Sequence, residues 1–138
     1  MPLGNVIAEF TLKAMSVRHH DIGGGQVRIE VDLAGEGTGQ IPGQNIGTLS
    51  AVAGSSPDHP NPWTYTGTLL AASGSVVRVS GQGAGIRTGQ GHKIRYRGVG
   101  CYSTDDPKLA MVNNLIAAVE FEADPATMMV KGASCEWK

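Results

Sequence analysis

The chain has 138 residues, of which 20 are glycine, 41% are hydrophobic and only 17% are charged, so it fits one compact domain over residues 1–138. Eleven Lys and Arg against 12 Asp and Glu give a net charge of −1, which excludes a strongly basic protein drawn to nucleic acid or an anionic membrane by its overall field. High glycine and low charge also exclude a coiled coil and an ionic disordered tail.

Apolar and polar residues alternate with a period of two in the first part of the chain, which predicts strands with one buried face. Residues 5–15 alternate in this way, with Val6 and Phe10 on the face predicted to be buried. Residues 27–33 alternate more cleanly after a turn at the three glycines 23–25. We therefore predict two antiparallel strands with water on their other face.

The middle of the chain contains two interruptions and a hairpin. Glycines over 35–39 are expected to end the second strand, and a weaker strand is predicted around 45–53. Residues 55–62 hold three prolines, which fix φ and lack an N–H donor, so this segment is predicted to be a loop. Residues 63–84 are predicted to form a hairpin around the tight turn 72–75.

The last part of the chain predicts three more strands and one short helix. Residues 91–102 alternate and place a basic face on one side of a strand. A helical turn is predicted near 107–113, because Pro is tolerated early in a helix and Thr104 or Asp105 can cap it. Residues 115–137 are expected to form a closing hairpin.

These elements amount to eight strands with connections too short for the crossovers of a parallel sheet. The sequence therefore predicts an all-β, mainly antiparallel, up-and-down fold with at most one short helical turn. A closed barrel accounts for so many strands, because closure removes the unpaired edges of an open sheet.

Three segments carry a resemblance to a known family. They are residues 65–69 (Tyr-Thr-Gly-Thr-Leu) with 73–77 (Ser-Gly-Ser-Val-Val), the glycine-dotted residues 81–85, and Lys-Gly at 131–132. Together they resemble the lipocalin-like, calycin-type barrels related to allene oxide cyclase, including an uncharacterised bacterial family of that shape. The resemblance covers about residues 26–137 and implies a small barrel that holds a small apolar molecule. It implies no reaction, because no catalytic residue of the plant cyclases matches a motif of this chain.

Aromatic residues are few, and their positions indicate a binding site. Five of them fall on faces predicted to point into the barrel, where they either fill the interior or line a pocket. Gly67, Gly81 and Gly98 are expected to leave volume beside them. The predicted ligand-binding residues are Phe10, Trp63, Tyr65, Arg95, Tyr96 and Phe121.

Metal and phosphate sites are disfavoured. Residues 19–21 (His-His-Asp) and the pair Asp58 and His59 could chelate a divalent ion only if two loops met, and adjacent histidines of an extended chain point to opposite faces. We expect these histidines to be solvated loop residues. Glycines 81–85 lack the βαβ frame of a dinucleotide site and are expected to bend a barrel strand. No metal or cofactor is predicted.

The basic face of the predicted strand 91–102 has two interpretations. Lys93, Arg95 and Arg97 could bind an anionic ligand or phosphates. The favoured interpretation is that they face water and pair with Glu120 and Glu122, or with acidic residues of 30–32. Too few aromatic residues accompany them for a nucleic-acid partner.

Cysteine spacing and the lack of long apolar runs indicate the compartment. Cys101 and Cys135 are 34 positions apart without a Cys-x-x-Cys spacing, which favours reduced, buried or idle thiols over a disulfide framework or a zinc site. Neither an export signal nor a run of about 18 apolar residues is visible. We therefore expect a cytoplasmic protein without a membrane partner.

The function predicted from these observations is binding of a small apolar or amphipathic molecule in the barrel mouth. One alternative is a cofactor-independent cyclase or isomerase, which needs an inward carboxylate or Arg95 at the pocket floor. Alternation places Glu120 and Glu122 outside instead. A second alternative is a homo-oligomeric interaction module with a filled barrel, whose weakly charged residues 33–86 form a subunit interface.

Overall fold

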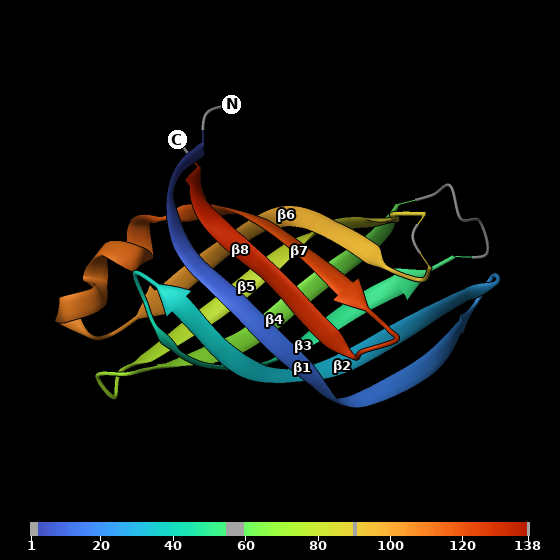
Figure 1. Cartoon of the computed structure of the whole chain (residues 1–138), viewed down its shortest axis with the longest axis horizontal. Coiled ribbons are helices and arrows are strands. Elements are labelled where there is room, and N and C mark those ends of the chain that lie inside the picture. The colour runs from blue at the N-terminus through green and yellow to red at the C-terminus, as the bar shows by residue number, and fades with distance from the viewer. Residues whose placement is uncertain (1–2, 55–59, 90, 138) are drawn as a thin grey trace.

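The computed structural model describes residues 3–54, 60–89 and 91–137, in which eight antiparallel strands close into one barrel (Figure 1). Each strand pairs with the next along the chain, and β1 also pairs with β8. The predicted up-and-down barrel with one short helical segment is therefore confirmed. In chain order the elements are β1 (Leu3–Gly23), β2 (Gln26–Gly39), β3 (Gly43–Ala53), β4 (Asn61–Ala71), β5 (Val76–Arg87), β6 (Ile94–Thr104), the 3-10 helix η1 (Pro107–Asn114), β7 (Ile116–Asp124) and β8 (Met129–Trp137).

Two clusters of buried side chains lie inside the barrel. They arise because alternate residues of every strand point inward, so that apolar residues from neighbouring strands meet. We call them the aromatic cluster and the helix-end cluster. The aromatic cluster contains Leu12, Leu33, Leu49, Trp63, Tyr96, Phe121 and Val130, and the helix-end cluster contains Ile7, Ile41, Leu69, Val77, Val112 and Ala117.

Helix η1 covers one end of the barrel (Figure 1). The side chain of Val112 is only 1% exposed and belongs to the helix-end cluster, so it plugs that end. The residue that caps η1 is Asp106, whose carboxylate accepts the backbone N–H of Lys108 at 2.9 Å, and not Thr104 or Asp105 as predicted. Thr104 instead donates its hydroxyl to the Val76 carbonyl. In the described chain no helix has the length and apolar character needed to cross a membrane.

A bulge near the start of β1 overturns one predicted face. The alternation predicts Val6 on the buried face, but Val6 is 42% exposed and Ile7 is fully buried. The pairing of β1 with β8 shifts register between Val6 and Ala8, which leaves an extra residue on β1. The extra residue of a β-bulge breaks the alternation of the strand, so the side chains before the bulge face the opposite way from the one predicted. Phe10 and Leu12, beyond the bulge, point inward as predicted.

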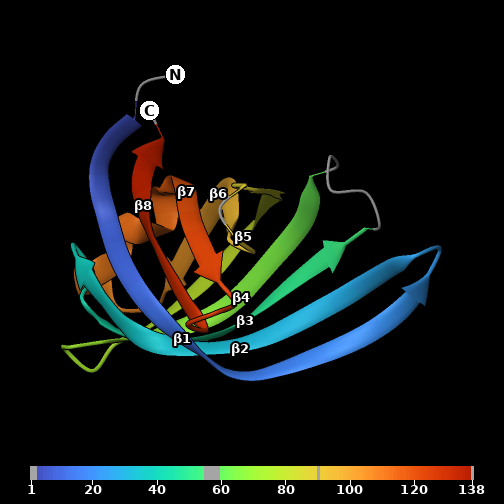
Figure 2. The same cartoon turned by 45° about the vertical axis from the view of Figure 1, so that its right-hand side comes forward.

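The hairpin of β1 and β2 extends beyond the rest of the barrel (Figure 2). Residues 19–21 lie within β1, so the predicted loop histidines are strand residues. Strand β2 likewise runs on to Gly39 instead of ending at the first glycine of 35–39. Pairing of β1 with β8 ends at Lys13, whereas pairing with β2 continues to Gly23. Beyond Lys13, β1 therefore pairs only with β2 among the described strands. Strand β2 in turn pairs with β3.

The start of β6 also differs from the prediction. The strand begins at Ile94 and not at residue 91. Gly89 and Gly91 both have positive φ, which forms a turn here, and the Thr88 N–H bonds the Lys93 carbonyl across it. The hairpin predicted over 63–84 is confirmed as β4 and β5.

Asp32 on the outer face of β2 is the centre of a hydrogen-bonded group. It accepts bonds from Arg18 at 2.7 Å, from the Ser16 hydroxyl at 2.6 Å and from the Thr48 hydroxyl at 2.9 Å. Chiefly through the bond from Arg18, these donors hold the pKa of the Asp32 carboxyl well below its usual range.

The lowered pKa of Asp32 predicts sensitivity to acid. Its carboxylate contributes stability above the unfolded pKa of about 3.9, and that contribution is lost as pH falls toward the folded pKa. We therefore expect an Asp32→Asn variant to lose less stability than the wild type between about pH 5 and pH 2. Urea unfolding at several pH values measures this difference. Thr48→Val removes one hydrogen-bond donor to Asp32, so its loss of stability over this pH range should be intermediate. If all three proteins lose stability equally, Asp32 is not the source of the acid sensitivity.

Candidate functional site

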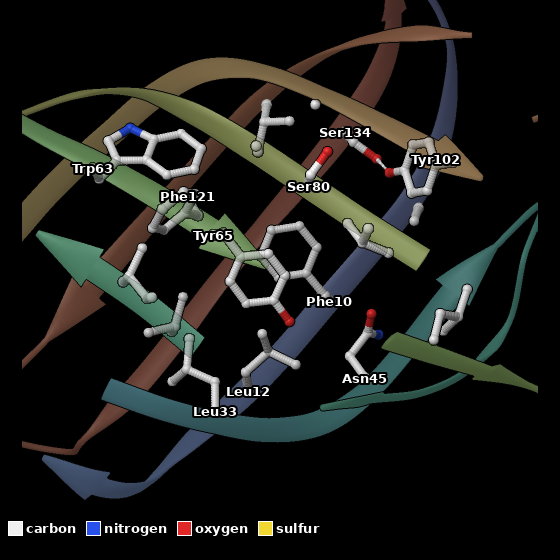
Figure 3. Close-up of a pocket in the computed structure, with 18 of the residues that line it drawn as sticks. Phe10, Leu12, Leu33, Asn45, Trp63, Tyr65, Ser80, Tyr102, Phe121 and Ser134 are labelled. Atoms are coloured by element: carbon white, nitrogen blue, oxygen red, sulfur yellow. Dashed lines mark hydrogen bonds between the residues drawn. The ribbon is translucent and has the colours of Figure 1, made fainter. Parts of the chain in front are cut away.

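A cavity of about 80 Å³ lies inside the barrel between the two clusters (Figure 3). An apolar cavity of about 150 Å³ holds benzene in another protein, so the enclosed part of this space is about half that size. The cavity is partly open to solvent, so a molecule of one substituted ring fits when part of it extends toward the opening.

Four of the six predicted binding residues line this cavity: Phe10, Trp63, Tyr65 and Phe121. The rings of Trp63 and Phe121 meet edge to face, with centroids 5.0 Å apart and an interplanar angle of 80°. The indole N–H of Trp63 donates to the Arg97 carbonyl at 3.1 Å, so the polar atom of this ring is satisfied outside the cavity. These aromatic rings form a fixed, apolar wall (Figure 3).

Tyr96 and Arg95 lie elsewhere. Tyr96 is buried and stacks on Phe121, with centroids 4.8 Å apart, but it does not line the cavity. Arg95 is its neighbour on β6 and therefore points to the outer face, where it pairs with Glu120 at 3.8 Å and with Glu122 at 3.9 Å. The favoured interpretation of the basic face, pairing with these two glutamates in water, is confirmed.

Polar groups reach the cavity from side chains that the aromatic pattern did not identify. Asn45 and Ser134 line it, as does Tyr102, and the hydroxyls of Tyr102 and Ser134 share a hydrogen bond of 2.6 Å. The other polar side chains of the lining are Tyr65 and Ser80. The period-two pattern itself could have identified Asn45, because Asn45 shares the inward face of β3 with Leu49.

Burial changes the chemistry of Tyr65. It raises the pKa of the phenol to about 12, so the group is neutral at physiological pH and can donate or accept a hydrogen bond. No charged side chain is among the described residues that line the cavity. The arrangement is therefore an apolar space with a few neutral hydrogen-bonding groups.

The three glycines expected to leave volume do so in different ways. Gly81 lines the cavity, with the Trp63 ring beside it. A Cβ at Gly98 would lie 2.7 Å from the Trp63 ring, and one at Gly67 would lie 2.6 Å from the Tyr65 hydroxyl. The space beside Gly98 and Gly67 is thus occupied by the aromatic side chains themselves. Only Gly81 adds to the open volume.

The other candidate sites do not assemble in the described residues. His20 lies on β1, where its Nε2 is 2.8 Å from a Glu30 carboxylate oxygen. Within the ranges described, no three metal-ligating side chains come together. Asp58 and His59 lie outside these ranges. Glycines 81–85 belong to strand β5, as expected.

Both cysteines are free thiols, as predicted. Cys135 is half-buried, whereas Cys101 is exposed on the outer face of β6 and is not a buried thiol. Alternation along β6 explains this, because the neighbouring Gly100 and Tyr102 face the cavity.

Comparison with solved structures identifies the same barrel in other proteins. A protein of unknown function from Clostridium acetobutylicum has a TM-score of 0.82 at 14% identity, with all of both chains covered. A β-barrel-like protein from Acinetobacter baumannii has a TM-score of 0.80 at 13% identity, covering 100% of this chain and 98% of that one. An enzyme from Penicillium herquei has a TM-score of 0.66 at 15% identity, covering 99% and 97%. No protein-family model and none of the curated proteins matches the sequence. At these identities the likeness shows the fold alone.

Proposed function

We propose that this protein binds a small apolar or amphipathic molecule inside its barrel. The observation that carries the proposal is the interior cavity of about 80 Å³, bounded by the rings of Phe10, Trp63, Tyr65 and Phe121. Transfer of apolar surface from water to such a space stabilises the complex by roughly 25 cal/mol per Å². The wall is held in place by ring contacts, so little ordering is required on binding.

Cavity size and lining define the class of ligand. A long acyl chain far exceeds a cavity of about 80 Å³, so we favour one ring with a short substituent. The resemblance to the barrels related to allene oxide cyclase also supports a site inside the barrel. The relationship to that family stays a prediction. The similar bacterial structures have no stated ligand.

The two alternatives find less support. A cyclase or isomerase was expected to use an inward carboxylate or Arg95, and the described residues that line the cavity include neither. Arg95, Glu120 and Glu122 pair on the outer face instead. A subunit interface over residues 33–86 stays a prediction, as does the cytoplasmic location.

Native mass spectrometry of the purified protein, followed by thermal melting with isopropylbenzene, tests the proposal. We expect a retained small molecule, or a Tm that rises by about 3–6 °C when the probe is at ten times its Kd. The absence of both a retained mass and a thermal shift would contradict the proposal.

A pair of variants on β5 provides the control. Val79 lines the cavity, so Val79→Phe should fill it and abolish the thermal shift. Val76 lies on the same strand but is 52% exposed, so Val76→Phe should leave the shift unchanged. An equal response of both variants would show that the probe binds elsewhere.

A further inference from the structure

We propose that the ligand is a neutral ring compound with one oxygen function, held by the Tyr65 hydroxyl and the Asn45 amide. This inference rests on the proposed function, because it assumes that the cavity is a binding site. It names the chemistry at one end of that site. Both side chains project from neighbouring strands into the same space (Figure 3).

The Tyr65 hydroxyl is available to a ligand. It has no hydrogen-bond partner among the described residues, and burial by itself accounts for its raised pKa. Every buried side-chain oxygen and nitrogen in the described chain has a partner, so the unpartnered Tyr65 hydroxyl keeps some accessible surface. Tyr65 lines the cavity. A half-buried neutral phenol without a partner is stabilised when it donates a hydrogen bond to a ligand oxygen.

Asn45 provides a second polar group in the same cavity. The Tyr65 hydroxyl lies over Gly47 of β3, where a Cβ would be 2.3 Å from its oxygen. Asn45 is two residues, or roughly 7 Å, from Gly47 along the same strand. The Asn45 amide lies over Gly37, and a Cβ at Gly37 would be 2.7 Å from the amide nitrogen of Asn45. The absence of a side chain at Gly37 and Gly47 thus leaves room for the Asn45 amide and the Tyr65 hydroxyl.

The amide of Asn45 is also without a hydrogen-bond partner among the described residues, whereas Tyr102 and Ser134 satisfy each other. An amide offers two donors and an acceptor, and a phenol offers one of each. Each can therefore form a hydrogen bond with a carbonyl or hydroxyl oxygen of a ligand in the cavity. Most of the remaining lining is apolar and suits a ring, with Ser80, Tyr102 and Ser134 as its other polar side chains.

Charge restricts the ligand further. The described cavity lining holds neither a cation nor a carboxylate. An anionic ligand would lose its hydration and find no positive charge in the cavity. The free-energy cost of this desolvation far exceeds the gain from one or two neutral hydrogen bonds. The site therefore selects the neutral ketone, aldehyde or alcohol over the carboxylate of the same ring.

Three probes of equal heavy-atom count test this: acetophenone, isopropylbenzene and benzoate, titrated by ¹H–¹⁵N NMR. Tyr65→Phe removes only a hydroxyl, and Asn45→Leu replaces the amide by an apolar side chain with the same number of heavy atoms and the same branching. Each change is expected to raise the Kd of acetophenone by about tenfold and to leave that of isopropylbenzene within about twofold. Benzoate is expected to bind at least about a hundredfold more weakly than acetophenone.

Tyr96→Phe is the matched control, because the Tyr96 phenol is also buried, with a pKa raised to about 12, but does not line the cavity. It should change neither affinity. If Tyr65→Phe and Asn45→Leu leave acetophenone binding unchanged, or if benzoate binds equally well, the inference is wrong while the binding function stands. If no probe binds the wild type, the proposed function itself fails.

Discussion

Replacing Trp63 by Ala is expected to lower the free energy of unfolding by about 3–5 kcal/mol, because it removes a large buried ring and leaves a cavity. Trp63 is only 3% exposed and contacts two other rings, Tyr96 and Phe121, edge to face. The substitution also removes the indole N–H that the Arg97 carbonyl accepts. Urea denaturation followed by far-ultraviolet circular dichroism measures the loss.

Two control variants separate the aromatic contacts from general sensitivity to substitution. Trp63→Phe keeps a ring against Phe121 and should cost clearly less than Trp63→Ala. Met15→Ala removes a side chain on β1 that is 66% exposed and should stay within about 0.5 kcal/mol of the wild type. Equal losses for Trp63→Ala and Met15→Ala would show that the aromatic cluster does not stabilise the barrel.

Replacing Gly98 by Ala is expected to destabilise the barrel by about 1–3 kcal/mol, although it adds one methyl group. Gly98 on β6 lies opposite Gly83 on β5. A Cβ at Gly98 would be 2.0 Å from the Gln82 carbonyl oxygen and 2.7 Å from the Trp63 ring. Because that oxygen belongs to the backbone, the two strands must separate locally or the indole must move.

Gly54→Ala is the matched control, since a Cβ at Gly54 meets nothing within 4 Å and its φ is not in the positive region. It should change the free energy of unfolding by no more than about 0.5 kcal/mol. The readout is the urea midpoint of each variant. A Gly98→Ala variant as stable as Gly54→Ala would contradict the close approach of β5 and β6.

Much of the candidate site could be predicted because the direction of a side chain within a strand is a local property. The pattern around Phe121 and Trp63 placed both rings inside, and both line the cavity. The sequence prediction assigns Arg95 to the ligand although alternation places it outside, with its glutamate partners. It omits Asn45 because it follows the aromatic residues, although alternation with Leu49 places Asn45 on the inward face of β3.

The position of Tyr65 and Asn45 in one cavity could not be predicted in the same way. It depends on the register that sets Gly47 opposite Gly67 across β3 and β4. Gly47, Gly67 and Gly37 then leave room for the two polar side chains. No local pattern encodes this arrangement, since it arises from strands that meet only in the closed barrel.

The sequence by itself determined the all-β class, the order of eight strands and, beyond the bulge of β1, most of the side chains that face inward, because period-two alternation and Gly or Pro turns act over a few residues. The tertiary structure decided the bulge that buries Ile7, the long hairpin of β1 and β2, and the cavity between the two clusters. Those features follow from how far each strand can pair before its neighbour ends, and from how rings on different strands share a fixed interior volume.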